Sequence, residues 1–139
     1  MESPSPILPH NKEAEEYLLG GVLLENSSLD IISEIISPED FYAERHRIIY
    51  EEMLSLRDRG LPIDLVSLVE SIESKGKQDK VGGASYIAQL ADRIPTTANI
   101  EYYARLIREK AILRSLIVGA GNIIKTARNP GEEVPLVLE

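Results

Sequence analysis

Apolar residues recur at spacings of three and four through most of the chain, which is the pattern of amphipathic helices. No stretch alternates convincingly between apolar and polar positions, as a half-buried strand would. Helices are predicted from residue 12 to about 26, from 27 or 28 to about 36, over 43–59, over 64–76, over 83–95 and over 97–128. The pattern therefore predicts an all-α protein with short connections.

Residues that start and stop helices support these boundaries. Asn11 and Asp64 can cap the helices that follow them, and Gly60 and Gly76 can supply left-handed stops. The segment 37–40, Ser-Pro-Glu-Asp, has the pattern of a further helix start. The stripes expected in the core are Ala14, Tyr17, Leu18, Gly21 and Val22, then Leu29, Ile32, Ile35 and Ile36, then Ile49, Met53 and Leu56, then Leu65, Leu68, Val69 and Ile72, and finally Tyr86, Ile87 and Leu90.

The segment 97–128 is predicted to be one long helix. It contains no proline, Thr97 can cap its start, and Asn129-Pro130-Gly131 ends it. At 1.5 Å per residue this helix would be roughly 45 Å long, whereas a small domain spans roughly 30 Å. Part of the helix is therefore expected to project from the body.

Beyond Lys110 the long helix is apolar over most of its circumference, and a helix that is apolar all round is buried all round. Since the projecting part cannot bury two faces against its own domain, we predict that one face meets another chain. Gly119 and Gly121 lower helix propensity but leave a flat patch that a second backbone can approach. The predicted subunit interface is Leu113, Leu116, Ile117, Ala120, Ile123 and Ile124. A core helix of an ordinary globular protein is the alternative.

Two units are predicted. Residues 1–95 form a compact multi-helical head with a short polar leader, and residues 96–139 form the long helix and the start of a second helix. Apolar residues 134–138 follow a turn, which suggests that the chain was cut from a longer protein within a helical hairpin. A frayed natural C-terminus is the alternative.

Composition narrows the class of protein. The 139 residues suffice for one domain with a real core, and the absence of cysteine excludes disulfides and thiolate chemistry. The apolar runs are too short to span a membrane, and the leader MESPSPILP is polar and broken by proline, unlike a signal peptide. We expect a soluble cytoplasmic protein.

The net charge of −8 is unevenly distributed. Residues 98–128 hold six basic and two acidic residues, a net charge of +4, while the remainder holds nine basic and 21 acidic residues, a net charge of −12. An acidic body repels phosphate, so direct nucleic-acid binding is disfavoured. The basic helix could face an acidic surface of a neighbouring copy, or could simply present a solvated face.

Candidate chemistry is sparse. His10 and His46 have no metal-ligand spacing, and His46, on a predicted helix, is expected to bond to a neighbouring element. The acid pairs at 15–16, 39–40 and 51–52 have the positions of helix-start or surface residues. No phosphate-binding loop or nucleophile motif occurs, so we predict no catalytic, cofactor or metal site.

A helix-turn-helix DNA reader is also disfavoured. Its recognition helix should present Arg, Lys, Asn or Gln to a groove, whereas the short helices here present glutamates. These are Glu34, Glu44, Glu51, Glu70 and Glu73.

Four segments carry a resemblance to a known family. They are PHNKEAEEYLLGGVLLEN, SPEDFYAERHRIIYEEM, GLPIDLVSL and VGGASYIAQLADRIPTTANIEYYARLIREKAILRSLI. In this order, from about Pro9 to Arg128, the chain resembles the amino-terminal domain of the bacterial replicative DNA helicase, the DnaB family. The extent of the match makes it far more specific than one short motif.

The resemblance implies a collar domain. In that family six such domains form a collar, by pairing of helical hairpins, over six motor domains that hydrolyse ATP with Mg and translocate 5′ to 3′ on single-stranded DNA. The motor is absent here, so neither helicase activity nor cofactor binding is expected of this chain. Primase, through its carboxy-terminal domain, is the expected partner besides further copies, and for the primase-facing surface we choose Glu13, Tyr86, Ile117 and Ile123. A purely structural role is the alternative for each of them, and Tyr86 is expected to belong to the core.

Two other functions stay open at this point. The chain could be a free-standing helical regulator that dimerises through its long helix. A small metabolic enzyme using surface carboxylates is a weaker alternative, and it would require a pocket with strongly shifted acids.

Overall fold

A computed structural model describes residues 7–93, 99–129 and 131, and these residues contain helices and no strand. The order is α1 (Lys12–Leu24), α2 (Ser28–Ile32), the 3₁₀ helix η1 (Pro38–Asp40), α3 (Glu44–Asp58), α4 (Leu65–Ser74), the 3₁₀ helix η2 (Gln78–Val81), α5 (Gly83–Arg93) and α6 (Ile100–Arg128). The predicted all-α class is confirmed. The start of the second hairpin helix lies outside the described residues.

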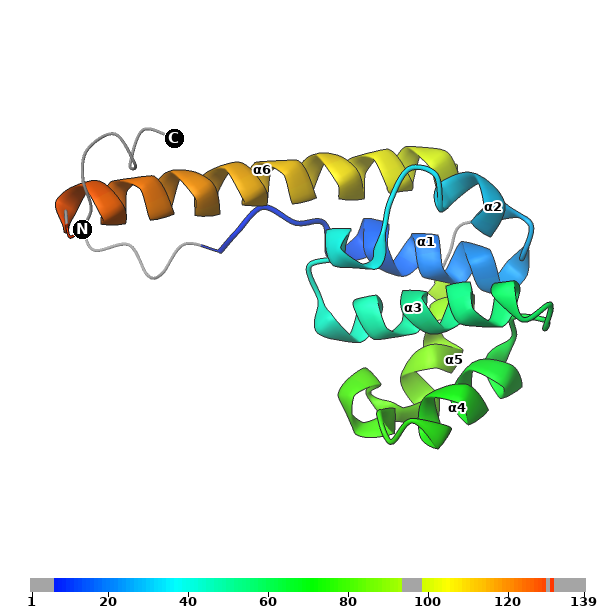
Figure 1. Ribbon diagram of the computed structural model, residues 1–139. Coiled ribbons are helices and arrows are strands. Elements are labelled where there is room, and N and C mark those ends of the chain that lie inside the picture. The colour runs from blue at the N-terminus through cyan, green and yellow to red at the C-terminus, as the bar shows by residue number, and fades with distance from the viewer. Residues whose placement is uncertain (1–6, 94–98, 130, 132–139) are drawn as a thin grey trace.

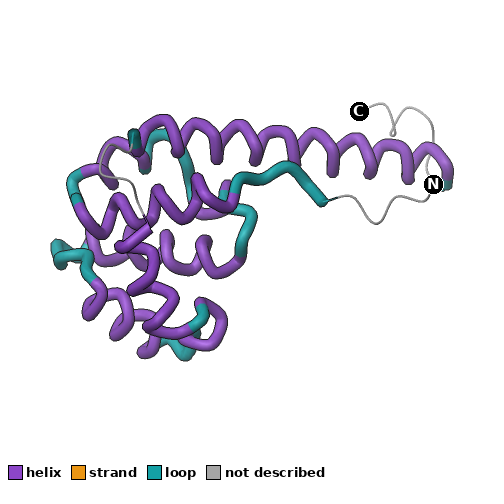
Figure 2. Tube along the Cα trace, turned by 180° about the vertical axis from the view of Figure 1, so that it is seen from behind, coloured by secondary structure: helices purple, strands orange, loops and turns teal. Residues whose placement is uncertain are grey.

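The first five α-helices and the beginning of α6 pack into the head (Figure 1). Helix α1 is central, because it contacts α3, α5 and α6. Helix α4 lies on the side of the head away from α6, and the rest of α6 projects from the head as a rod (Figures 1 and 2). The 29 residues of α6 make a helix about 43 Å long.

Local capping explains several helix boundaries. Asn11 accepts a hydrogen bond from the Ala14 amide (3.0 Å), and Asp64 accepts one from the Ser67 amide (2.8 Å), as predicted. Gly60 and Gly76 adopt left-handed φ values of 70° and 68° directly after their helices.

Several expected boundaries differ in the structure or lie outside the described residues. Helix α2 ends at Ile32, about four residues before its predicted end. The long helix begins at Ile100, because Asn99, not Thr97, accepts the capping bond from the Tyr102 amide (3.1 Å). Segment 37–40 forms only the short η1, and the loop before Gly82 contains η2. Thr97 and the predicted stop at Pro95 lie outside the described residues.

Most residues of the predicted stripes lie in the core, together with residues outside the stripes such as Leu19, Phe41 and Tyr50. Leu65 is the main exception, since 41% of it is exposed. Every α-helix of the head contributes at least one fully buried apolar side chain. Within the described residues, no helix combines the length and the apolar character needed to cross a membrane.

Candidate interaction surface

Helix α6 changes character along its length. Its first part is held in the head by the buried residues Ala104, Ile107 and Ala111. From Ile112 to Arg128 no residue is buried, although this part contains most of the large apolar side chains of the helix. The predicted projection of the long helix from the body is therefore confirmed.

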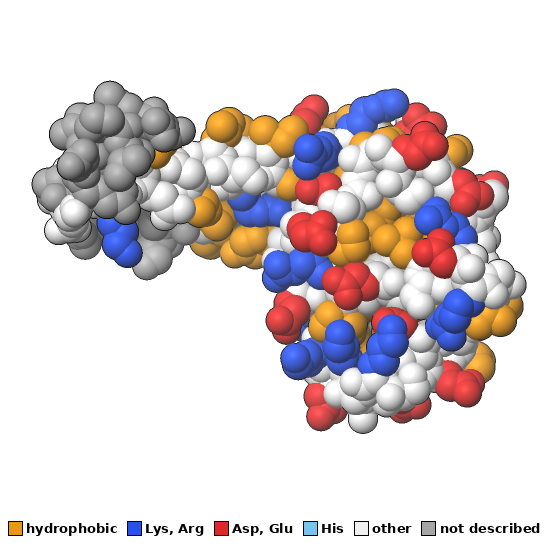
Figure 3. Space-filling view, in the orientation of Figure 1, with side chains coloured by type: hydrophobic (Ala, Val, Ile, Leu, Met, Phe, Trp, Pro, Cys, Tyr) orange, Lys and Arg blue, Asp and Glu red, His pale blue; other side chains and the backbone are white. Residues whose placement is uncertain are grey.

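The exposed apolar residues of α6 form one continuous surface, called here the apolar strip. Leu116 and Ile123 are the most exposed of its large side chains, at 64% and 63%. The strip consists of Ile112, Leu113, Leu116, Ile117, Ala120, Ile123 and Ile124, which includes all six residues predicted for a subunit interface. Apolar side chains line the projecting part of α6 in Figure 3.

The strip is one-sided, which corrects the expectation that apolar residues cover most of the circumference. At 3.6 residues per turn its seven members fall within an arc of about 140°. Only Val118 lies on the other side, where it lines a hollow of about 510 Å³ with Leu8 and Asn122. The middle of the strip is about 180° from the side occupied by Ala104, Ile107 and Ala111. The strip therefore faces away from the head.

Two arginines fix α6 where it leaves the head. Arg108 Nη1 lies 3.0 Å from the carboxylate of Asp40. Arg114 donates to the carbonyl oxygens of Pro9 (2.9 Å) and Asp40 (2.7 Å), and its guanidinium lies over the ring of Tyr42. These contacts attach the projecting helix to both η1 and the leader.

No local pattern identified this attachment. Asp40 lies 68 positions from Arg108 and 74 from Arg114 along the chain. The sequence shows both arginines as part of a basic helix, but their partners emerge only from the tertiary fold.

The head also contains four buried carboxylates, which corrects the expectation that the acid pairs are exposed. Each has a basic partner from another element: Glu15 with His46, Glu16 with Arg93, Asp40 with Arg108 and Glu52 with Lys75. Glu39 and Glu51, by contrast, are exposed. Because buried charges are costly without partners, these pairs are structural features of the head.

One of these pairs belongs to a larger network. His46 is fully buried, its Nδ1 donates to Glu15 (2.7 Å), and its Nε2 contacts the hydroxyl of Tyr86. The prediction that His46 bonds to neighbouring elements is thus confirmed. Tyr86 donates to Glu16 (3.3 Å), and its burial, followed by the nearby Glu16 carboxylate, raises the pKa of Tyr86 to about 12. The tyrosine stays protonated at physiological pH.

The two residues chosen on the head as primase-facing differ in accessibility. Glu13 is exposed in the first turn of α1. Tyr86 is only 9% exposed, and Arg45 covers one face of its ring. Tyr86 is therefore a core residue, and its role toward a partner stays a prediction.

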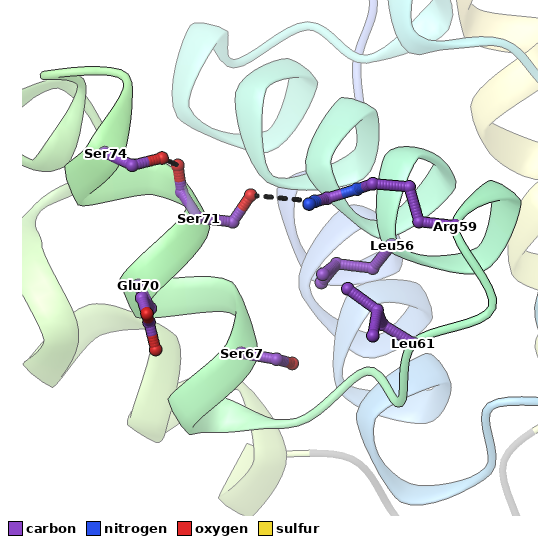
Figure 4. A pocket seen from close by; sticks show the side chains of 7 residues that line it. All are labelled: Leu56, Arg59, Leu61, Ser67, Glu70, Ser71 and Ser74. Atoms are coloured by element: carbon purple, nitrogen blue, oxygen red, sulfur yellow. Dashed lines mark hydrogen bonds between the residues drawn. The ribbon is translucent and has the colours of Figure 1, made fainter.

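Other sites offer little chemistry. In the described part of the chain no three His, Cys, Asp or Glu side chains gather in a way that could hold a metal ion. A hollow of about 270 Å³ lies between the end of α3 and α4, where Arg59 donates to Ser71 (Figure 4). The hydroxyl of Ser71 also donates to the buried carboxylate of Glu52 (2.6 Å), which Lys75 engages as well. The remaining lining, Leu56, Leu61, Ser67, Glu70 and Ser74, contains no histidine or lysine that could act as a base.

Comparison with known proteins gives a consistent result. Residues 7–109 match the model of the DnaB-like helicase N-terminal domain. Over 133 residues the chain is 41% identical to the replicative DNA helicase DnaB of Geobacillus stearothermophilus. This match covers 96% of the chain but 29% of that relative, so the chain spans less than a third of the relative's length.

Solved structures agree with the sequence matches. The N-terminal domain of DnaB helicase from Mycobacterium tuberculosis superposes with a TM-score of 0.91 at 33% identity, over 95% of this chain and 93% of that one. A DnaB-like replicative helicase, solved in a study of its interactions with primase, superposes with a TM-score of 0.74 at 26% identity. That match covers 92% of this chain and 31% of the helicase.

Proposed function

The chain belongs to the family of the DnaB-like helicase N-terminal domain, and we propose from this premise that it is the non-catalytic assembly and docking domain of a replicative DNA helicase. In the full-length protein, copies of this domain join into a hexameric collar. The collar also recruits primase through its carboxy-terminal domain. As part of a bacterial replication protein, the domain works in the cytoplasm.

The apolar strip is the observation that carries this proposal. Seven neighbouring apolar residues on a projecting helix face away from the head, and large exposed apolar patches are typical of interaction sites. Burying one fully exposed Leu or Ile side chain contributes about 1.5–3 kcal/mol, so burial of the large side chains of the strip would offset much of the several kcal/mol that association costs. A second apolar surface from another copy is the simplest complement.

The enzymatic activity belongs to the rest of the protein. We propose that the parent chain is an ATP-dependent 5′ to 3′ DNA helicase whose ATP and Mg bind in a motor domain beyond this chain. Positioning of motors, rather than nucleotide chemistry, is the task of the present domain.

Primase docking is proposed at the strip and the neighbouring head. A DnaB-like helicase with a similar fold is described together with its interactions with primase. Ile117 and Ile123 offer apolar contacts, and the exposed Glu13 offers a carboxylate. Tyr86 acts indirectly, by holding Arg45 and the beginning of α5 in place.

The test is a double substitution, Ile117→Asp and Ile123→Asp, in the full-length protein. Two carboxylates in the middle of an apolar interface would be desolvated without partners, at a cost of several kcal/mol. We expect one of two changes. The protein concentration at which hexamers dissociate, measured by light scattering coupled to size exclusion, rises at least tenfold above that of the wild type, or the affinity for primase falls at least tenfold.

A matched control places the same charges on the other side of the same helix. Ser115→Asp with Asn122→Asp adds two carboxylates to α6 outside the strip, where both residues are exposed. This variant should assemble and bind primase nearly as the wild type does. Unchanged assembly and unchanged primase affinity in the strip variant, with α-helical circular dichroism retained, would remove the assignment.

A further inference from the structure

Helix α4 has an apolar surface of its own on the outside of the head. Val66 is 72% exposed and Leu65 is 41% exposed, although α4 is otherwise anchored by the buried residues Leu68 and Ile72. Together with Val69 and Ala84 of α5, they line a shallow hollow of about 470 Å³.

The rim of this hollow is acidic. Glu70 and Glu73 follow Val66 at spacings of four and seven, so the three side chains share one outward stripe of α4. The lining contains no lysine or arginine. Within the described residues neither glutamate takes part in a salt bridge.

The buried, paired Glu52 nearby differs from the exposed Glu70 and Glu73. Glu52 lies on α3, is buried, and is fully engaged by Lys75 (2.6 Å) and Ser71 (2.6 Å). The acids inside the head have partners in the same chain, whereas those beside Val66 face solvent. Glu70 and Glu73 are therefore accessible to a basic group of another molecule.

We propose that this face of α4 docks a basic amphipathic segment of another protein. Apolar side chains at helical spacing would fill the hollow beside Leu65, Val66 and Val69, while lysine or arginine side chains would pair with Glu70 and Glu73. Such exposed pairs are individually weak, and complementary charge adds mainly specificity and rate of encounter.

This surface is separate from the apolar strip and goes beyond the proposed assembly function. Figure 1 shows α4 and α6 on opposite sides of the head. A partner on α4 would therefore leave the strip free, and the two sites can be occupied at the same time.

The probe for the test is a 14-residue peptide of leucine and lysine at helical spacing, titrated into the ¹⁵N-labelled chain and followed by NMR. We expect amide shifts concentrated in residues 65–74 and at Ala84, with a dissociation constant in the micromolar range. A peptide with glutamate in place of lysine should not bind. Glu70→Lys with Glu73→Lys should weaken binding at least tenfold.

The matched control is Glu34→Lys with Glu51→Lys, which makes the same change of net charge at exposed glutamates of the head that do not belong to α4. This variant should bind the leucine-lysine peptide within about twofold of the wild type. Equal weakening by both variants would show attraction to overall charge and would overturn the proposal. Peptide-induced shifts that map to α6 would also overturn the proposal. So would shifts in α4 that depend on the concentration of the chain in the absence of peptide, because they would identify a second copy of the chain as the occupant.

Discussion

At the scale of single residues, buried polar and charged side chains link the helices of the head. Glu15, Glu16, His46 and Tyr86 join α1, α3 and α5 through hydrogen bonds that lie away from solvent. An apolar core alone tolerates small shifts between helices, whereas these bonds require particular positions. Substitutions within the network should therefore affect stability more than their small change in volume suggests.

Tyr86→Phe tests this network. The substitution keeps the ring but removes the hydroxyl that contacts His46 and donates to Glu16, leaving buried polar atoms with fewer partners. We expect a loss of about 1–3 kcal/mol in the free energy of unfolding, measured by urea denaturation. Tyr102→Phe is the control, because Tyr102 is 53% exposed and should change the free energy little. Equal effects of the two substitutions would contradict the role of the network.

The same tyrosine predicts a dependence on alkaline pH. Burial, then the Glu16 carboxylate, raises the pKa of Tyr86 to about 12, above the value of 10.0 expected in the unfolded chain. A raised pKa stabilises the fold fully below pH 10, and this contribution is lost as the pH rises through about 12. The difference in unfolding free energy between wild type and Tyr86→Phe should therefore shrink between pH 9 and pH 11.5. A difference in unfolding free energy that stays constant over this pH range would contradict the raised pKa of Tyr86.

At the scale of elements, α6 combines a buried base with a free rod. The base is held by the small residues Ala104 and Ala111 and by the two arginines that contact η1 and the leader. Beyond the contacts of Arg114, no described residue of the rod is buried, so its helical structure depends largely on local propensity and on whatever covers the strip.

Arg114→Ala should loosen the attachment of the rod. It removes charge-assisted hydrogen bonds to the carbonyls of Pro9 and Asp40, worth about 1.5–3 kcal/mol each. We expect faster amide hydrogen exchange in residues 7–10 and 112–118. Arg105→Ala is the matched control, since Arg105 makes only an exposed pair with Glu101 and should leave exchange there unchanged. The same exchange pattern in both variants would refute the prediction.

Gly119→Ala with Gly121→Ala should strengthen the rod itself. A Cβ at either position meets no atom within 4 Å, and each substitution gains about 1 kcal/mol of helix propensity. Slower amide exchange in residues 115–128 of this chain is expected. Because the two glycines flank the strip, the added methyl groups should also weaken assembly of the full-length protein. Assembly that becomes tighter would show that no second backbone comes close there.

The predicted and observed helix boundaries agree where they depend on residues close by in the sequence. Asn11, Asp64, Gly60 and Gly76 act within a few residues of their own positions, so the helix boundaries that depend on them were predictable. Thr97 was the wrong cap, because Asn99 is an equally suitable residue two positions later. Local patterns identify candidates for capping and do not rank them.

The candidate surface was predictable in composition but not in orientation. Apolar residues without a place in a small domain pointed to Leu116 and Ile123, and both proved exposed. The buried acids were missed, because the partner of Glu15 lies 31 positions away and that of Glu16 lies 77 positions away. Such pairs depend on the packing of whole helices.

At the scale of the whole molecule, charge and apolar surface are divided between two parts. The long helix is positive, the remaining sequence is negative, and the strip faces away from the head. The two parts could join copies in different ways: through apolar contact between rods, or through attraction between a basic rod and an acidic head.

The response of full-length assembly to salt separates these modes. We expect assembly to depend mainly on the strip, so hexamers should persist when sodium chloride rises from 0.1 M to 0.5 M, where exposed charges are strongly screened. Ammonium sulfate should strengthen assembly, because it favours burial of apolar surface. Analytical ultracentrifugation measures both responses. Dissociation in sodium chloride would favour the charged contact instead.

The attachment of α6 at its base has a mechanical consequence. Residues 112–128 extend about 25 Å beyond the last buried residue, Ala111. With Arg108 and Arg114 acting as the fulcrum, a tilt of about 10° there would swing the tip by about 4 Å, somewhat less than the roughly 5.4 Å pitch of the helix. Small rearrangements around Asp40 would thus be magnified along this lever arm into a change of spacing between neighbouring heads.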